Sequence, residues 1–245
     1  MCDLIKDNET LDDLQVNDLY IIQKENGFRF GIDAILLANY PNIKRGDFVA
    51  DFCSGSGVIS ILVVGKRGAK GAIQFEVQEQ YCEMAQRTIE YNKLSYNIQV
   101  VCTDIGDKTI VPREKFDVVL CNPPYFSPKS GGITELDSTA IARHEILCDV
   151  TKVTTSAAWA LKYGGKLAII HRPERLVDIL TDMRASNIEP KRICPVCSRI
   201  NQPPVMILVE GVKGGKSGLL WDNPIIVYND DGTYTQQINE IYGRY

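Results

Sequence analysis

The sequence predicts one α/β domain in which a mainly parallel β-sheet carries helices on both faces. From about residue 47, short apolar segments that suit strands alternate with segments whose apolar residues recur at helical spacing. Glycine-containing turns separate several of these segments, and no internal repeat, low-complexity tract or linker interrupts the 245 residues. Strands that alternate with helices form βαβ units with right-handed crossovers, so a mainly parallel sheet of seven strands is expected.

The expected core runs from residue 47 to residue 211. Pro173 suits the first turn of a helix, where the missing N–H is not needed, and Gly164-Gly165 is expected to end the helix before it. The last two strands have no helix between them and are expected to pair antiparallel. The expected strands are 47–53, 72–76, 98–102, 116–121, 166–171, 188–196 and 205–211, and the expected helices are 57–65, 79–92, 146–161 and 173–186.

Segments outside this core are expected to form hairpins. An Asn-Gly pair at 26–27 lies between strand-like runs within residues 19–30. An Asp-Gly pair at 231–232 lies between the β-forming segments 225–228 and 233–235. Such dipeptides favour tight turns. The chain is therefore expected to consist of an N-terminal hairpin segment (1–46), a core (47–211) and a C-terminal hairpin extension (212–245), all in a single domain.

Composition indicates an ordinary globular protein without a membrane span. Hydrophobic residues make up 44% of the chain and charged residues 24%. No apolar run approaches the roughly 18 residues that a spanning helix needs. The acidic start at residues 1–4 lacks the basic and apolar regions of a signal peptide. A cytoplasmic location is therefore expected.

The cysteines do not predict a metal site. The eight cysteines are scattered along the chain, and Cys194 and Cys197 form one CxxC pair with no second pair nearby. Only two histidines are present. Because structural zinc requires four ligands, neither metal binding nor a redox motif is expected.

Charge is distributed unevenly. The net charge of −4 is not that of a strong nucleic-acid binder. Acidic residues dominate 3–18, whereas basic residues dominate 191–218. A locally basic segment is compatible with RNA contact through part of the surface, although such clusters are usually solvated faces.

The segment 51–57 has the form of a nucleotide-type cofactor loop. Its sequence, Asp-Phe-Cys-Ser-Gly-Ser-Gly, follows an apolar strand and opens a helix. The glycines allow close approach of the backbone to a ligand, and the helix N-terminus supplies unpaired N–H groups. Glu76 ends the next strand 19 residues beyond Gly57, which suits a carboxylate that binds ribose hydroxyls.

Two ligand classes fit this loop, and its charge favours one of them. A dinucleotide site prefers a third glycine three residues after Gly57, where this chain has Ser60. Asp51 would repel a pyrophosphate but would attract the ammonium of a methionine moiety, which favours S-adenosylmethionine. Asp104 ends the third strand, where it could accept a hydrogen bond from the cofactor adenine while Ile105 contacts the ring. The motifs thus nominate Asp51, Cys53, Gly55, Gly57, Glu76, Val77, Asp104, Ile105 and Asn122 as cofactor-binding residues.

The most specific motif is Asn122-Pro123-Pro124-Tyr125, which follows the fourth strand. Two prolines stiffen the turn and remove backbone donors, so the Asn122 side-chain oxygen and the Pro123 carbonyl can each accept one hydrogen of an NH₂ group. These bonds would draw a planar amine towards tetrahedral geometry and expose its lone pair to the methyl sulfonium. Tyr125 offers a flat face for a splayed-out base, and adenine carries such an amine at N6. Catalysis would then rest on positioning and electrostatics.

Residues 47–171 resemble the core of the class I methyltransferases, because 51–57, Glu76, Asp104 and 122–125 match its successive motifs. The whole chain is similar to the bacterial tRNA1(Val) (adenine-37-N6)-methyltransferase family. Cys194-Pro195 departs from the His-Pro expected there and lies outside the motifs. The segments that carry the wider likeness are 28–37, 142–145 and 209–216.

This resemblance implies a Rossmann-like class I fold, S-adenosylmethionine as cofactor, and N6-methylation of adenosine 37 in a tRNA. It also implies that the segment before the first strand closes over the cofactor, which adds Phe30, Gly31 and Asp33 as cofactor contacts. RNA is the expected partner. The basic candidates for RNA contact, each equally consistent with a solvated surface charge, are Arg29, Lys129, Arg143, His144, Lys213 and Lys216.

Three alternatives stay open. A protein glutamine N5-methyltransferase would present the same amide hydrogens to the same acceptors, but such enzymes carry a helical N-terminal domain, and only about 45 residues precede the first core strand. A ribosomal RNA guanine N2-methyltransferase usually has Phe in place of Tyr125. A non-catalytic module that binds cofactor and RNA would not need the intact segment 122–125.

Overall fold

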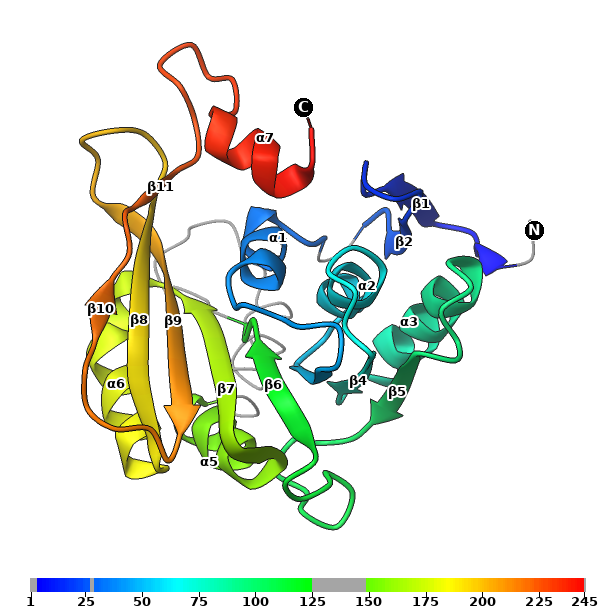
Figure 1. Ribbon diagram of the computed structural model, residues 1–245. Helices are drawn as coiled ribbons and strands as arrows, with labels where there is room; N and C mark the ends of the chain where they lie inside the picture. Colours follow the sequence, from blue (N-terminus) through cyan, green and yellow to red (C-terminus); the bar gives the residue numbers. More distant parts are fainter. Residues whose placement is uncertain (1–3, 27–28, 125–148, 245) are drawn as a thin grey trace, which may run out of the picture.

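The computed structural model describes residues 4–26, 29–124 and 149–244. Within them, a nine-stranded sheet runs in the order β10-β8-β9-β7-β6-β3-β4-β5, and β11 pairs with β8 (Figure 1). Its parallel centre consists of β3 (Phe48–Phe52), β4 (Gly71–Glu76), β5 (Ile98–Cys102) and β6 (Phe116–Cys121).

The other strands extend the sheet on the β6 side. β7 (Leu161–His171) is parallel to β6, and β9 (Pro204–Lys213) runs antiparallel between β7 and β8 (Ile188–Cys197). The expected antiparallel final pair and the expected seven core strands are therefore confirmed. Two short strands, β10 (Leu220–Trp221) and β11 (Ile225–Ile226), are added parallel to β8.

Helices cover both faces of the sheet, and each layer has its own apolar core. One core contains residues of α1 (Ile32–Asn39), α2 (Val58–Gly65), α3 (Glu79–Tyr91) and α7 (Gln236–Tyr242). The other contains residues of α5 (Val150–Ala160) and α6 (Leu176–Ala185), and a 3₁₀ turn at Pro173–Arg175 precedes α6. The expected two-faced α/β architecture is confirmed.

Burial on both faces explains why the central strands have nearly continuous apolar sequences. Phe52, Phe75 and Phe116 lie in adjacent strands and have no exposed surface. Their rings meet edge to face, with centroids 5.5 Å apart for Phe52 and Phe75 and 6.0 Å apart for Phe75 and Phe116. These contacts fix the register of β3, β4 and β6, whose carboxyl ends form one edge of the sheet.

The N-terminal hairpin lies earlier in the chain than expected. β2 (Tyr20–Lys24) pairs with the preceding β1 (Glu9–Asp13) and not with the residues that follow the Asn-Gly pair. Gly27 of that pair lies outside the described residues. The connecting turn uses Asn17 and Asp18, both at a φ of +51°, a conformation that Asn and Asp adopt more readily than most residues. Part of the acidic segment 3–18 therefore forms a strand.

Two further boundaries differ from expectation. α5 ends at Ala160 and β7 begins at Leu161, so Gly164 and Gly165 lie inside a strand and do not end the helix. Lys115 and Glu114 donate backbone hydrogen bonds to the last carbonyls of α5, which allows the chain to turn at once. Residues 146–148 of the expected helix lie outside the described residues.

The C-terminal extension forms less hairpin than expected. Tyr228 and Tyr234 make a single antiparallel bridge around Gly232, which has a φ of +86°. The preceding Ile225–Ile226 pairs with β8, and α7, which the sequence did not predict, follows the bridge. Ile238 of α7 is fully buried in the core that contains α1.

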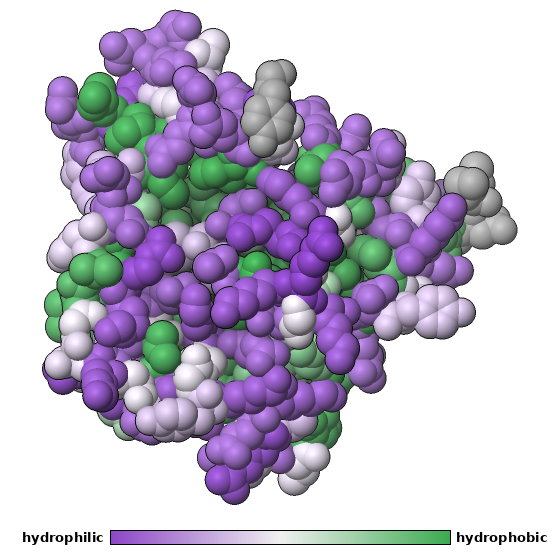
Figure 2. All heavy atoms as spheres, in the orientation of Figure 1, coloured by the Kyte–Doolittle hydropathy of each residue, from purple (hydrophilic) through white to green (hydrophobic). Residues whose placement is uncertain are grey.

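Hydrophilic residues predominate on the face shown in Figure 2, and hydrophobic ones are scattered over it in small groups. Among the described residues, none of the helices is both long enough and apolar enough to span a bilayer.

Candidate active site

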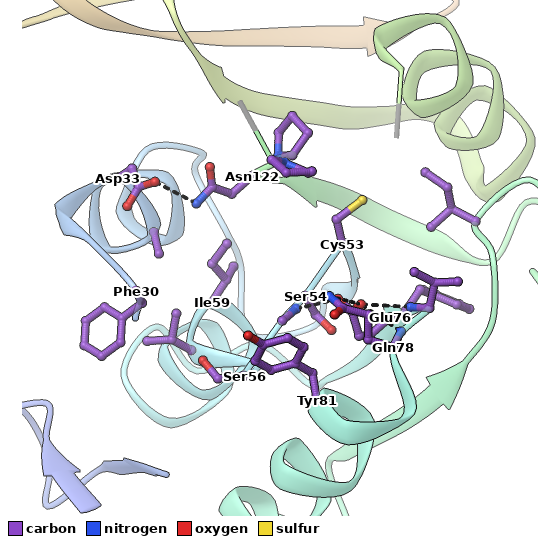
Figure 3. Close-up of a pocket in the computed structure, with 18 of the residues that line it drawn as sticks. Phe30, Asp33, Cys53, Ser54, Ser56, Ile59, Glu76, Gln78, Tyr81 and Asn122 are labelled. Atoms are coloured by element: carbon purple, nitrogen blue, oxygen red, sulfur yellow. Dashed lines mark hydrogen bonds between the residues drawn. The ribbon is translucent and has the colours of Figure 1, made fainter. Parts of the chain in front are cut away.

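A cavity of about 280 Å³ opens at the carboxyl edge of the parallel strands. In an open α/β sheet this edge is where ligands bind. Its wall is built from the residues that follow β3, β4, β5 and β6, together with the start of α1 (Figure 3). Of the predicted cofactor and catalytic residues, the structure brings together here Phe30, Asp33, Cys53, Gly55, Glu76, Val77, Asp104, Ile105, Asn122, Pro123 and Pro124.

The glycine loop after β3 depends on left-handed backbone conformations. Gly55 and Gly57 have φ values of +54° and +85°, and Gly57 is the N-cap of α2. A Cβ added at Gly57 would lie 2.4 Å from the Gln74 side chain, whereas nothing lies within 4 Å of one added at Gly55. Gly55 is part of the cavity wall. Gly57 does not line the cavity and lies against the Gln74 side chain.

Glu76, the last residue of β4, anchors this loop from the neighbouring strand. One carboxylate oxygen accepts a hydrogen bond of 2.9 Å from the backbone nitrogen of Gly55, and the other accepts bonds of 3.0 Å from Val77 and Gln78. The side chain is 6% exposed and lies on the cavity wall. Carboxylate oxygens have several acceptor sites, so these bonds leave capacity for ligand hydroxyls.

Asp51 lies behind the cavity wall and does not contact the cavity. The residue has no exposed surface, and one of its oxygens accepts bonds from the Ser60 nitrogen (3.1 Å) and hydroxyl (2.9 Å) in the first turn of α2. Burial raises the pKa of this carboxyl to about 7, against the lowering effect of the Ser60 bonds. Asp51 is therefore not among the residues that line the cavity, and its contact with a ligand ammonium stays a prediction. One Asp51 oxygen thus holds the first turn of α2 through Ser60, and the other is buried with no hydrogen-bond partner among the described residues.

Asp104 and Ile105 follow β5 and also line the cavity. The Asp104 carboxylate accepts bonds from the Gly106 nitrogen at 2.8 Å and from the Lys152 ammonium at 2.5 Å. Ile105 is 5% exposed and packs into the core while its surface forms part of the cavity. An acceptor beside an apolar surface suits one edge and one face of a planar ring.

Asn122, directly after β6, contacts Asp33 of α1 at one end of the cavity. The Asn122 side-chain nitrogen donates a hydrogen bond of 3.0 Å to Asp33 Oδ2 (Figure 3). The Asn122 side-chain oxygen is buried and has no hydrogen-bond partner among the described residues. An unsatisfied buried acceptor is costly, so it marks a place where a ligand donor belongs.

The N-terminal hairpin helps to position Phe30 on the cavity wall. Gln23 of β2 is 2% exposed, and its side-chain oxygen accepts a bond of 2.9 Å from the Phe30 nitrogen. Gly31, the N-cap of α1, does not line the cavity. Several wall residues were not nominated from the sequence. Ser56 lies inside the glycine loop, whereas Gln78, Tyr81 and Thr103 lie beside the motifs.

Among the described residues, the three nominated for RNA contact (Arg29, Lys213 and Lys216) do not line this cavity. Arg29 donates to Thr10 and pairs with Asp12 on β1. Lys213 is 12% exposed, donates to the Leu161 carbonyl and pairs with Glu114. Because β9 is antiparallel to β7, Lys213 lies at the sheet edge opposite Asn122. Lys216 is exposed in the following loop, and Tyr125, Lys129, Arg143 and His144 lie outside the described residues.

A family model supplies the decisive comparison. The model described as "Methyltransferase small domain" matches residues 31–183, which is more than half of the chain. The chain belongs to this methyltransferase family. S-adenosylmethionine is therefore its methyl donor, as the loop and the acid after it predicted.

The curated relatives are distant but cover most of the methyltransferase. A protein of Haemophilus influenzae named tRNA1(Val) (adenine(37)-N6)-methyltransferase is 23% identical over 91% of this chain and 93% of its own. Proteins of the same name from Parabacteroides distasonis and Porphyromonas gingivalis are 23% and 25% identical over 74% of this chain, and over 76% and 73% of their own.

Solved structures show the same fold. A predicted O-methyltransferase of Agrobacterium tumefaciens is 22% identical, with a TM-score of 0.68 over 86% of this chain and 96% of its own. M. jannaschii TYW2, solved in complex with AdoMet, is 14% identical, with a TM-score of 0.57 over 84% of this chain and 86% of its own. The expected Rossmann-like class I methyltransferase fold is confirmed.

The residues of the cavity fit the cofactor. Gly55 permits close approach of the backbone, Glu76 presents a buried carboxylate for hydroxyl groups, and Asp104 with Ile105 offers an acceptor beside an apolar surface. When bound, S-adenosylmethionine supplies an electrophilic methyl group on a sulfonium. The residues of this chain contribute the positioning and the hydrogen bonds around it.

Proposed function

We propose that this methyltransferase acts on the N6 amine of an adenine in RNA, and that its substrate is adenosine 37 of a tRNA. The observation that carries the proposal is the buried Asn122 side-chain oxygen on the cavity wall, directly before Pro123 and Pro124, which has no hydrogen-bond partner among the described residues. That oxygen requires a hydrogen-bond donor, and an exocyclic amine supplies one. The names of the distant relatives support the choice of a tRNA adenine.

In the proposed reaction, the amine donates one hydrogen to the Asn122 side-chain oxygen and the other to the Pro123 carbonyl. These bonds draw the nitrogen towards tetrahedral geometry and expose its lone pair. The new bond forms between this nitrogen and the methyl carbon as the carbon–sulfur bond breaks, and the surplus proton leaves to solvent. No strong base is needed, because the barrier is lowered by orientation and by the two acceptors.

Several nominated residues have a proposed role. Glu76 would hold the ribose of the cofactor, and Asp104 with Ile105 would hold its adenine. Phe30 and Tyr125 would contact planar groups, and Tyr125 would stack on the substrate base. Arg29, Lys129, Arg143, His144 and Lys216 are proposed to contact the RNA backbone. Lys213 is left out because its side chain is only 12% exposed and its ammonium is bound within the protein.

The test is to identify the methylated product. The full chain is incubated with radiolabelled S-adenosylmethionine and, separately, with total tRNA lacking the modification, ribosomal RNA and a peptide release factor. We expect label in tRNA that co-migrates with N6-methyladenosine after digestion. Label in methylglutamine or in N2-methylguanosine would identify one of the alternative amines, and label in none of these substrates would contradict the proposal.

A matched pair of variants tests the acceptor mechanism. Asn122→Ala should lower kcat by about 100- to 1000-fold, as loss of one transition-state hydrogen bond does, while binding of S-adenosylhomocysteine persists. Asn223→Ala, at an exposed position after β10, serves as the control. If Asn122→Ala turns over like the control, the amine is not held as proposed.

A further inference from the structure

Asp33 and Asn122 are separated by 89 positions in the sequence, and the fold brings their side chains together at 3.0 Å. Figure 3 shows the pair at one end of the cavity, with Asp33 on α1 and Asn122 at the end of β6. A carboxylate only accepts hydrogen bonds, so the NH₂ half of the amide must face Asp33. The amide oxygen therefore faces away from Asp33, and it is this oxygen that lacks a partner among the described residues.

The local structure of α1 holds Asp33 where it meets this amide. Asp33 lies in the first turn of the helix, where the helix dipole stabilises a negative charge. Gly31 is the N-cap, and a Cβ added there would lie 2.7 Å from Asp33 Oδ1. The glycine thus leaves room for the carboxylate in the orientation that contacts Asn122.

We propose that Asp33 is a positioning residue that fixes the polarity of Asn122, so that the site presents only an acceptor to the substrate. This inference rests on the proposed function. A substrate group that donates hydrogen bonds, such as an amine, can then bind to the Asn122 oxygen. A carbonyl at the same place could not bind, because it would face another hydrogen-bond acceptor. Asp33 acts through Asn122, which distinguishes this role from the direct cofactor contact expected from the sequence.

The negative charge of Asp33 also strengthens the acceptor. A hydrogen bond donated by the amide NH₂ polarises the amide and makes its oxygen more negative, because linked hydrogen bonds reinforce one another. As the substrate nitrogen gains a methyl group, positive charge develops on it until its proton leaves. An acceptor held and polarised in advance stabilises that charge. Without Asp33, the amide could turn and present its NH₂ group to an amine.

The main test compares Asp33→Asn with the reciprocal double variant Asp33→Asn/Asn122→Asp. In the single variant either end of the new amide can face Asn122, so we expect kcat on unmodified tRNA to fall by about 10- to 100-fold, as for loss of a charged hydrogen bond. The KM for tRNA and the Kd for S-adenosylhomocysteine should change less than about twofold on this view. In the double variant the introduced amide donates to the introduced carboxylate, which keeps an oxygen for the amine, so part of kcat should return.

A second measurement needs no substrate. The side-chain NH₂ resonances of Asn122, assigned by their loss in Asn122→Ala, should shift in Asp33→Asn because the hydrogen bond to a carboxylate is lost. Gly31→Ala should produce a smaller shift in the same resonances, since its new methyl displaces the carboxylate without removing it. Unchanged resonances in both variants would overturn the inference.

The kinetic outcomes separate this inference from the proposed function. If Asp33→Asn keeps a normal kcat while Asn122→Ala is inactive, Asp33 does not position the amide and only this inference fails. If Asp33→Asn keeps kcat but weakens S-adenosylhomocysteine binding at least tenfold, Asp33 is a cofactor contact and the inference also fails. If Asn122→Ala is as active as the natural chain, the proposed function itself fails.

Discussion

The Glu76 carboxylate accepts a hydrogen bond of 2.9 Å from the backbone nitrogen of Gly55. The acid that ends β4 therefore fixes the glycine loop that follows β3, and both residues belong to the wall of the same cavity. One side chain thus shapes the loop and presents the carboxylate that is proposed to hold the ribose. The two functions should be lost together when that side chain is changed.

Replacing Glu76 with Gln should weaken cofactor binding strongly. The new NH₂ group would face a backbone N–H that now donates to a carboxylate oxygen. Loss of a charged hydrogen bond costs about 1.5–3 kcal/mol, which corresponds to a rise of about 10- to 100-fold in the Kd for S-adenosylhomocysteine. Isothermal titration calorimetry measures this Kd. Glu79→Gln, an exposed change three residues along the chain, is the control, and equal affinities for the two variants would contradict the assignment.

The two glycines of the loop offer a matched comparison. Both have positive φ, but only a Cβ at Gly57 meets another side chain, 2.4 Å from Gln74. Gly55→Ala should therefore cost about 1–2 kcal/mol of unfolding free energy from backbone strain alone. Gly57→Ala should cost about 1–3 kcal/mol more, because its methyl overpacks a buried site. Urea denaturation compares the two, and a Gly55→Ala variant that is the less stable would show that the packing argument is wrong.

Much of the core could be predicted because its apolar periodicity follows directly from burial on one or both faces of a sheet. The strand ends near Glu76 and Asn122 could be predicted for the same reason, since polar residues appear where a buried strand reaches the edge of the sheet. The helix Ile32–Asn39 was missed. Its consecutive buried residues, Ala34 to Ala38, show no polar face to mark it as a helix.

Other parts of the site depend on relationships that the sequence does not display. Asp51 can be recognised in the sequence as an acidic residue, but its complete burial behind the loop cannot be read there. The bond between Asp33 and Asn122 joins distant segments, and no local pattern indicates it. Tyr81, in the first turn of α3, lies on the cavity wall because of how this helix is placed after β4. That placement belongs to the fold and is not visible in the local sequence.

Arg87 ties the N-terminal hairpin to α3, and its removal should destabilise the protein. Its guanidinium donates to both oxygens of Glu9, at 2.6 and 2.8 Å, and to Glu83 at 2.8 and 2.9 Å. The side chains of Arg87 and Glu9 are 10% and 8% exposed. Arg87→Met leaves the largely buried Glu9 carboxylate without its ion-pair partner and should cost up to about 3 kcal/mol in urea denaturation.

Two related variants check the cause. Glu83→Gln removes a half-exposed partner and should cost about 1 kcal/mol or less. Glu9→Gln/Arg87→Met removes both buried charges and should recover most of the stability lost by Arg87→Met alone. If the double variant is no more stable than Arg87→Met, an unpaired charge is not the reason for the loss.

The ion pairs of Arg87 with Glu9 and Glu83 should stabilise the folded chain at neutral pH and lose this effect in acid. The hydrogen bonds from Arg87 lower the pKa of Glu9 below its usual 4.5 and that of Glu83 to about 2. A lowered pKa means that the stabilisation is present above pH 4.5 and is lost as pH falls through the folded-state value. The stability difference between the natural chain and Arg87→Met should therefore shrink between pH 4.5 and 2. A difference that stays constant over this range would contradict the ion-pair interpretation.

Asp51 should have the opposite pH dependence. Burial raises its pKa from 3.8 to about 7, so between these values the folded chain holds a proton that the unfolded chain has released. Its favourable contribution is therefore present below pH 3.8 and is lost as pH rises through about 7. Asp51→Asn stays neutral and keeps an oxygen for Ser60. Its stability relative to the natural chain should rise by at most about 1.4 kcal/mol per pH unit between pH 4 and 7, and then level off.

Urea denaturation of both proteins at pH 5, 6, 7 and 8 measures this difference. Asp230→Asn, at an exposed position in the C-terminal turn, provides the control for loss of a surface carboxylate. The control should show no comparable slope, because an exposed carboxyl is solvated alike in the folded and unfolded chain. A slope for Asp51→Asn that matches the control would mean that Asp51 is already charged when folded. Ser60 and the first turn of α2 would then have to stabilise a buried anion behind the cofactor loop.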